Sequence, residues 1–249
     1  MIQFLHVTKT YEDNWKALCD VTLRINQGEF VFLTGHSGAG KSTLLKLIYM
    51  DERPDEFHGG EVMVQFNKDL VFDTKTATEK QVQELRRHMG IVFQDFKLLP
   101  DRNVFENVAL ALRITGTPEK QLNSRVFDAL ALVGISQKRL AMPYTLSGGE
   151  RRKLEIARAL VRRPSVLMLD EPFAGVDPLA VHDIQEIVRN LRKQGLGVVI
   201  TDHNVRETLN VVDRAYLVYN GRLLCEGTSE HLVNDEEARR LYLGENFRM

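Results

Sequence analysis

The chain has 249 residues, which suffices for one large domain, or a core with a modest appendage, that needs no disulfide or metal to hold it together. Hydrophobic residues make up 43% of the chain, charged residues 27%, and the net charge is −1, so the composition suits a soluble globular protein and gives no electrostatic reason to expect nucleic acid as a partner. The two cysteines, Cys19 and Cys225, lie far apart without the spacing of a metal or redox site, which favours a reducing compartment.

The sequence shows no segment that would place the chain in a membrane. Its N-terminal residues lack the apolar segment of a signal peptide, and no apolar run approaches the roughly 20 residues that cross a bilayer. If the protein works at a membrane, another chain would have to anchor it.

The first part of the chain is predicted to be rich in strands. Hydrophobic patterning predicts strands at 2–11, 21–25 and 28–35, a helix at 41–50, a strand pair within 60–73, an amphipathic helix at 78–90 and a short strand at 91–94.

The rest of the chain is predicted to be helical and then alternating. Residues 101–142 have helical spacing with a break at "TGTP". From residue 147 onward, helices and strands alternate, with helices at 150–163, 180–195 and 205–212, strands at 166–170, 197–202, 214–220 and 221–227, and a helical tail. This alternation predicts an α/β fold with a parallel sheet, and residues 101–142 form a helical insert in it.

Residues 35–45, "GHSGAGKSTLL", follow an apolar strand and precede a helix, and they match the pattern G-x-x-x-x-G-K-[ST] in the context that this motif requires. Small residues allow backbone N–H groups to surround an anion at a helix N-terminus. The alternative, a glycine-rich turn that carries a lysine by chance, does not explain the flanking strand and helix. We therefore predict a phosphate-binding loop in which Lys41 contacts the β- and γ-phosphates and Ser42 binds Mg²⁺. Its residues are Gly35, His36, Ser37, Gly38, Ala39, Gly40, Lys41, Ser42 and Thr43.

Two carboxylates end the apolar strand in "VLMLDEP", residues 166–172. Asp170 is predicted to bind Mg²⁺ directly or through water, and Glu171 to polarise an attacking water as general base. In isolation such a pair often caps a strand in solvent. Downstream of a phosphate-binding loop, the pair favours nucleotide hydrolysis over nucleotide binding alone.

A third motif, "LSGGERRKLEIARAL", begins at Leu146. Ser147 and Glu150 have the spacing of a capping box, so a helix is predicted to begin here, and Gly148 and Gly149 would leave its first N–H groups uncovered. An ordinary capped surface helix has the same composition. The stretch resembles the signature motif of ABC-type ATPases, in which the usual residue at position 150 is Gln. In that family the signature of one subunit closes over the γ-phosphate held by the other, so two subunits enclose two ATP molecules.

Further motifs of the ABC-type ATPases follow in order. Gln94 resembles the Q-loop glutamine that links Mg²⁺ and water to the helical insert. Asp177 in "AGVDP" resembles the D-loop aspartate, and His203 in "ITDHN" resembles the switch histidine that contacts the γ-phosphate. Tyr11 resembles the aromatic residue that stacks on adenine, with Trp15 as a nearby competitor.

The resemblance implies the fold of a P-loop NTPase, an ABC-type nucleotide-binding domain with a parallel-sheet core, an antiparallel β subdomain and a helical insert. Within a single domain, residues 1–93 and 147–230 are predicted to form the core with the β subdomain, 94–146 the insert and the lead-in to the signature, and 231–249 a C-terminal tail. It also implies ATP and Mg²⁺ as cofactors, with Ser42, Gln94 and Asp170 around the metal. The chain would form a homodimer on ATP binding and attach to an integral membrane subunit at the inner face of the cell membrane.

The two halves of the chain resemble different branches of the family. Up to about residue 115 the sequence resembles the cell-division type, FtsE, whereas from about 146 onward, "LDEPFAGVDP" and the ending "YLGENFRM" resemble the lipopolysaccharide-export type, LptB. A recombined, engineered or inferred sequence and a lineage of mixed features both account for this pattern. The resemblance places the groove for the membrane subunit at about 94–135, where Phe96, Leu98, Leu99 and Pro100 would line the groove or pack in the core. Phe247 would be the tail residue that supports an export complex, or an apolar residue of a frayed terminus.

Three functions therefore compete. The first is the ATPase of a membrane export complex of the lipopolysaccharide or lipid type. The second is a division-type subunit whose nucleotide state regulates a membrane partner. The third is a nucleotide-gated binding module with negligible turnover, against which the presence of Glu171 and His203 argues.

Overall fold

The computed structural model describes residues 1–57, 59–244 and 247, and it divides into two compact units. Unit 1 comprises Met1–Arg86 and Gly197–Met249, and unit 2 comprises Arg87–Leu196. Across the described part of the chain, none of the helices has both the length and the apolar character that crossing a bilayer demands.

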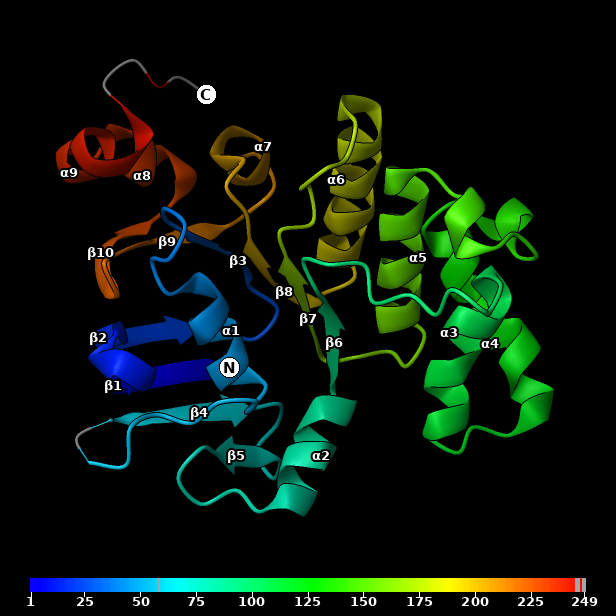
Figure 1. Cartoon of the computed structure of the whole chain (residues 1–249), viewed down its shortest axis with the longest axis horizontal. Helices are drawn as coiled ribbons and strands as arrows, with labels where there is room; N and C mark the ends of the chain where they lie inside the picture. The colour runs from blue at the N-terminus through cyan, green and yellow to red at the C-terminus, as the bar shows by residue number, and fades with distance from the viewer. Residues whose placement is uncertain (58, 245–246, 248–249) are drawn as a thin grey trace. The chain divides into compact units, whose positions relative to one another are not determined.

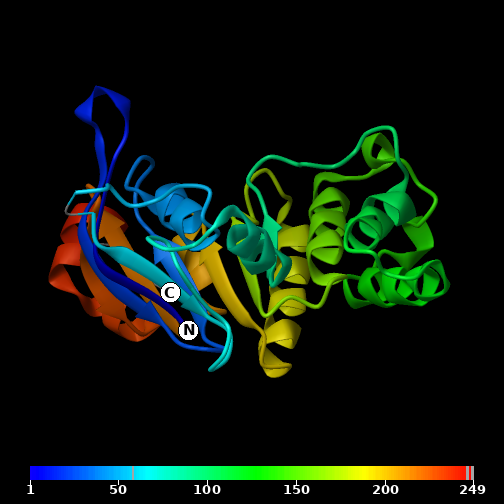
Figure 2. The ribbon, with the colours of Figure 1, turned by 90° about the horizontal axis from the view of Figure 1, so that it is seen from below.

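An antiparallel sheet of order β2-β1-β4-β5 makes up one part of unit 1 (Figure 1). It consists of β1 (Ile2–Thr10), β2 (Lys16–Ile25), β4 (Glu61–Gln65) and β5 (Val71–Asp73). The strand predicted at 21–25 begins earlier, at Lys16, because β2 pairs with β1 as far as the Thr10–Lys16 pair. The resulting β1–β2 hairpin, whose tip carries the 3₁₀ turn η1 (Glu12–Asn14), extends away from the body of unit 1 (Figure 2).

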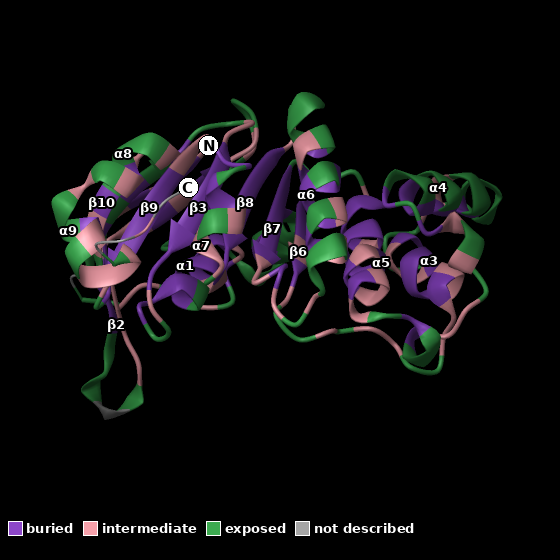
Figure 3. Cartoon of the chain, turned by 90° about the horizontal axis from the view of Figure 1, so that it is seen from above, coloured by how far each residue is buried: buried purple, intermediate pink, exposed green. Residues whose placement is uncertain are grey.

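A second group of strands in unit 1 has the order β10-β9-β3-β8. β3 (Phe30–Thr34) runs parallel to both β8 (Gly197–Thr201) and β9 (Arg214–Tyr219), and β9 pairs antiparallel with β10 (Arg222–Gly227). All residues of β3 and β8 are buried (Figure 3), which explains their uninterrupted apolar sequences. The helical elements of this unit are α1 (Lys41–Ile48), α7 (Val205–Leu209), α8 (Ser229–Asn234), α9 (Glu236–Ala238) and the π-helical turn η4 (Arg239–Leu243), with α2 (Glu79–Arg87) at its boundary.

Unit 2 contains two parallel strands and four helices. β6 (Met89–Val92) pairs with β7 (Val166–Asp170) from the Met89–Val166 pair onward. The helices are α3 (Val104–Ile114), α4 (Glu119–Leu132), α5 (Gly148–Leu160) and α6 (Pro178–Lys193), with short 3₁₀ turns η2 (Ser136–Lys138) and η3 (Pro143–Thr145) before α5. The predicted helical stretch at 101–142 is therefore two helices, and the predicted break at "TGTP" lies between them.

Candidate functional site

The predicted phosphate-binding segment, residues 35–43, consists of the loop 35–40 between β3 and α1 and the first three residues of α1. The shape of the loop requires glycine at two positions. Gly40 precedes α1 with φ of 110°, and a Cβ atom there would lie 2.5 Å from the carbonyl oxygen of Ala17. A Cβ atom on Gly35 would lie 2.1 Å from the carbonyl oxygen of Val218. A side chain at either position would collide with backbone, so the glycines permit the close approach that this loop needs.

Lys41 is buried although its side chain carries a charge, with only 8% of the residue exposed. Its Nζ donates hydrogen bonds to the carbonyl oxygens of Gly35, at 2.6 Å, and His36, at 2.9 Å. Ser37 and Ser42 are exposed. The ammonium group is thus held inside the loop while the two hydroxyl groups are accessible to a ligand.

The turn between β9 and β10 supports this loop. His36 Nε2 lies 3.2 Å from Asn220 Oδ1, and the His36 ring meets the Tyr219 ring edge-on with centroids 5.2 Å apart. The backbone N–H of Gly221 donates to the carbonyl oxygen of Ala39 at 3.1 Å. Sequence analysis did not find these contacts because they join residues far apart in the chain.

The C-terminal tail also reaches the start of the loop. The hydroxyl groups of Tyr242 and Thr34 are 2.8 Å apart, although the two residues are 208 positions apart in sequence. Burial raises the pKa of Tyr242, so this phenol is a neutral hydrogen-bonding group at physiological pH. Further along, the Arg206 guanidinium lies over the Phe247 ring, 5.8 Å from its centroid.

The two aromatic residues that competed for adenine stack on each other. The rings of Tyr11 and Trp15 have centroids 5.7 Å apart and planes 21° apart. The Tyr11 hydroxyl lies 3.4 Å from Thr43 Oγ1, at the end of the phosphate-binding loop, and Trp15 is 52% exposed. The structure therefore brings the aromatic pair and the loop together in unit 1.

His203 lies in the turn that follows β8, with 59% of its side chain exposed. The fully buried Asp202 fixes this turn, because its carboxylate accepts a hydrogen bond from the backbone N–H of Asn204 at 2.7 Å. The same carboxylate lies 3.8 Å from His203 Nδ1. This arrangement positions the imidazole while leaving much of it accessible.

In unit 2, Asp170 ends β7 and Glu171 follows it in a left-handed conformation, with φ of 49°. For a residue other than glycine this backbone geometry costs about 1–3 kcal/mol and persists only where the surroundings enforce it. The carbonyl oxygen of Glu171 accepts hydrogen bonds from the N–H of Ala174 at 3.2 Å and from Arg152 Nη2 at 3.4 Å. The backbone of the predicted general base is therefore held by two donors.

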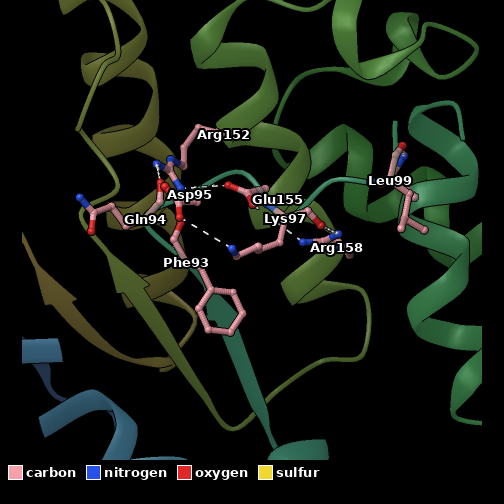
Figure 4. A network of polar contacts seen from close by, with 9 residues as sticks. Phe93, Gln94, Asp95, Lys97, Leu99, Arg152, Glu155 and Arg158 are labelled. Atoms are coloured by element: carbon pink, nitrogen blue, oxygen red, sulfur yellow. Dashed lines mark hydrogen bonds and ion pairs between the residues drawn. The ribbon is translucent and has the colours of Figure 1, made fainter. Parts of the chain in front are cut away.

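Arg152 joins two of the predicted site residues, Gln94 and Glu171, through their backbones, and Figure 4 shows its position beside Gln94. From α5 its guanidinium donates to the carbonyl oxygens of Phe93, at 2.6 Å, and Gln94, at 3.0 Å, in addition to that of Glu171. Gln94 itself is exposed, so its carboxamide is accessible while its backbone is held. Sequence analysis did not assign a role to Arg152.

Glu155 balances the charge of Arg152, and both residues are only 1% exposed. One carboxylate oxygen lies 2.9 Å from Arg152 Nη1, and the other accepts a hydrogen bond from the N–H of Lys97 at 2.8 Å. Burial raises the pKa of Glu155, and the Lys97 N–H and the charges of Arg152 and Arg158 oppose that shift. Arg158 also donates to the carbonyl oxygen of Lys97, so the segment after Gln94 is fixed to α5.

The apolar residues after Gln94 lie beside this network. Two guanidinium groups cover the ring of Phe96. The Cζ atoms of Arg151 and Arg152 lie 5.0 Å and 4.8 Å from the ring centroid. Leu98 and Leu99 are half-buried, Pro100 is exposed, and the backbone of Leu99 is held by the buried side chain of Asn107. Contacts within the chain therefore hold this loop in place.

The signature motif begins α5 with the predicted capping box. The Ser147 hydroxyl accepts from the N–H of Glu150 at 3.2 Å, and the Glu150 carboxylate accepts from the N–H of Ser147 at 2.9 Å. Gly149 has a packing role as well, since a Cβ atom there would lie 2.3 Å from the Cβ of Ala180 in α6. Asp177 caps α6 by accepting from the N–H of Ala180 at 3.0 Å. The signature and the segment around Asp177 are thus packed together within unit 2.

Comparisons with known proteins agree on one family. A family model described as "ABC transporter" matches residues 18–174. The lipopolysaccharide export system ATP-binding protein LptB of Haemophilus influenzae is 39% identical over 98% of this chain and 97% of its own length. The cell division ATP-binding protein FtsE of Bacillus subtilis is 37% identical over 92% of this chain and 96% of its own length. The dimeric ATP-binding cassette MJ0796 in a post-hydrolysis state bound to ADP and Pi superposes with a TM-score of 0.81 at 29% identity, over 92% of this chain and 99% of that one. The predicted fold class is confirmed.

Proposed function

Because the chain belongs to the ABC transporter ATPase family and is an ATPase, we propose that it powers a membrane export complex of the lipopolysaccharide type. The relative from Haemophilus influenzae supports this choice, since the match extends over nearly the whole length of both chains. The motifs "LDEPFAGVDP" and "YLGENFRM" favour the same branch.

ATP binds in this proposal with its phosphates in residues 35–43 and its adenine on the stacked pair of Tyr11 and Trp15. The buried ammonium of Lys41 exchanges its contacts with carbonyl oxygens for contacts with the β- and γ-phosphates. The exposed hydroxyl groups of Ser37 and Ser42 are accessible to the same ligand.

The oxygen-rich donors of Ser42, Asp170 and Gln94 fit a magnesium ion, which prefers hard oxygen ligands. The Ser42 hydroxyl and the Gln94 carboxamide are exposed, and Asp170 is partly exposed at the end of β7. When bound, Mg²⁺ would neutralise charge on the β- and γ-phosphates.

The observation that carries the proposal of hydrolysis is the bridge that Arg152 makes between the backbones of Gln94 and Glu171. Glu171 orients and deprotonates the attacking water, and His203 stabilises charge on the transferring phosphoryl group. Catalysis then depends on positioning and electrostatics, for which a rigid link between the two segments is suited.

A second copy of the chain completes each site on ATP binding. Ser147, Gly148 and Gly149 of the partner close on the γ-phosphate, with the helix N-terminus of α5 directed at the anion, while Glu150 caps that helix. Asp177 caps α6 through Ala180, the residue against which Gly149 of the signature packs. The dimeric state of the solved relative MJ0796 supports this arrangement.

The partner that ATP hydrolysis drives in this proposal is an integral membrane subunit. It binds at the groove near residues 94–135, so the chain acts on the cytoplasmic face of the membrane. The proposal requires no nucleic acid.

The second candidate function is that of a division-type subunit whose nucleotide state regulates its membrane partner. The resemblance to FtsE over most of both chains favours it.

Phosphate release by the purified chain, measured beside Glu171→Gln with the mass followed by light scattering, tests the catalytic assignments. We expect turnover in the wild type, a loss of about 10²–10⁴-fold in the variant, and an ATP-locked dimer of the variant. Normal turnover by Glu171→Gln would show that another group activates water.

Reconstitution then separates the two branches. The wild-type chain is combined in nanodiscs either with the membrane subunits of lipopolysaccharide export or with the division-type membrane subunit from the same source. Stimulation of phosphate release by the export subunits alone supports the proposal, and stimulation by the division-type subunit alone would overturn it in favour of the second candidate.

A further inference from the structure

Three side chains with metal-ligating atoms meet in unit 1, away from the nucleotide motifs. The Sγ of Cys225, a ring nitrogen of His231 and a carboxylate oxygen of Asp235 all lie within 4.8 Å of one another. Neither the phosphate-binding loop nor the signature includes any of these residues. Sequence analysis did not find this cluster, because its single cysteine, Cys225, does not form the closely spaced cysteine pair that is typical of a metal site.

The local fold explains how the three residues meet. His231 lies in α8, and Asp235 is the residue directly after that helix. Because the two residues are four positions apart, their side chains project from the same face of the helical turn. Cys225 lies in β10, the strand that leads into α8, and its side chain is buried. Gly227 allows the imidazole to pack against the strand, since a Cβ atom there would lie 2.5 Å from His231 Cδ2.

From this geometry we propose that Cys225, His231 and Asp235 form a binding site for a borderline transition-metal ion of the Zn²⁺ class. In a tetrahedral zinc site, sulfur, nitrogen and oxygen ligands lie about 3.3–3.6 Å apart, as follows from metal–ligand distances of about 2.0–2.3 Å. The ligand atoms lie within 4.8 Å of one another, so their separations exceed those of a closed site by at most about 1.2–1.5 Å. In the proposed site, the exposed side chain of His231 moves toward Cys225 and Asp235 as the metal binds.

The chemistry of the three donors selects the metal. A thiolate and an imidazole favour Zn²⁺, Co²⁺ and similar ions over Mg²⁺ and Ca²⁺, which bind oxygen ligands. Binding breaks the S–H bond of Cys225, and its proton passes to solvent as the Sγ–metal bond forms. Three protein ligands leave a fourth position for water.

The site is accessible from solvent. A hollow of about 430 Å³ is lined by His231, Asn234, Asp235, Glu236 and Glu237. An ion can enter there, and the added negative charge of the two glutamates favours a cation. One side of the cluster is fixed in advance, because Asp235 also caps α9 through the N–H of Ala238 at 2.7 Å.

Titration of the metal-free chain with Co²⁺, without nucleotide, without oxygen and in excess Mg²⁺, tests the site. We expect one Co²⁺ per chain with a thiolate-to-cobalt charge-transfer band that stoichiometric Zn²⁺ abolishes. Cys225→Ser removes the band, while the matched control Cys19→Ser keeps it. His231→Ala is expected to weaken Co²⁺ binding at least about 10–100-fold, because loss of a residue that only orients a metal ligand already has an effect of that size. The control His182→Ala in α6 is expected to leave Co²⁺ binding unchanged.

A measurement on the unmodified protein guards against variants that fold poorly. X-ray absorption of the chain loaded with one equivalent of Zn²⁺ is expected to show one sulfur at about 2.3 Å and lighter ligands at about 2.0–2.2 Å. A zinc shell without sulfur, or a wild-type chain that gives no cobalt charge-transfer band, would overturn the proposal. A band of equal strength in Cys225→Ser would do so as well.

Discussion

Replacing Arg152 by methionine removes the group that joins the backbones of Gln94 and Glu171. The guanidinium is 1% exposed and donates to three backbone carbonyl oxygens and to Glu155. Loss of one partner from a buried ion pair costs about 3–5 kcal/mol, because the other charge remains buried without compensation. We therefore expect Arg152→Met to lower the free energy of unfolding by about 3–5 kcal/mol.

The same change should slow turnover through a second route. A displacement of about 1 Å in a positioning group can cost about 100-fold in rate. Because Arg152 holds backbone and does not itself contact phosphate in our proposal, kcat for phosphate release should fall while the KM for ATP changes little.

The double variant Arg152→Met with Glu155→Leu separates these effects. Apolar residues in place of a buried ion pair are often neutral or stabilising, so the double variant should regain much of the stability measured by urea unfolding. Its turnover should stay low, because the carbonyl oxygens of Gln94 and Glu171 still lack their shared donor. Arg151→Met is the matched control, since this neighbour also covers Phe96 but is only partly buried. Recovery of turnover together with stability would refute the positioning role.

Three further predictions concern backbone geometry, packing and charge. In urea unfolding, Glu171→Gly should be about 1 kcal/mol more stable than Glu171→Ala, because a backbone φ of 49° is strained for alanine and not for glycine. Equal stabilities would mean that the backbone strain is relieved elsewhere. Gly149→Ala should destabilise the chain by about 1–3 kcal/mol, and adding Ala180→Gly should restore part of that loss by removing the opposing Cβ; an unimproved double variant would contradict the packing role. The hydrogen bond from the N–H of Ser147 lowers the pKa of Glu150 from 4.5, so the stabilisation that its carboxylate provides is present above pH 4.5 and lost as the pH falls through the folded pKa. The stability difference between the wild type and Glu150→Gln should shrink over that acid range, as unfolding curves at several pH values would show.

Local patterns predicted most of the fold. The strands and helices of 28–50 and 147–227 follow from hydrophobic period and from glycine and proline positions, since these signals act within a few residues. The capping box at Ser147 is of the same kind, because both of its hydrogen bonds join residues three apart. Such features can be derived from sequence because their physical causes are local.

Contacts between distant segments could not be derived in this way. The Tyr242–Thr34 hydrogen bond and the support of His36 by Asn220 depend on how β3, β9 and the tail pack. Arg152 did leave a signal, because it lies three residues after Gly149 and four before Ile156, on the face of α5 that is buried. A charged residue at a core position of an amphipathic helix indicates a buried partner, and Glu155 is that partner.

The hydrogen bonds of Lys41 to the carbonyl oxygens of Gly35 and His36 bear on the shape of the loop that they span. One ammonium group joins the first residue of α1 to the first two residues after β3, so the loop is closed on itself by its own lysine. A loop that is ordered in this way loses less entropy when a ligand binds, because much of that entropy is lost during folding. For the phosphate binding that we propose, Lys41 would therefore contribute by ordering the loop as well as by its charge.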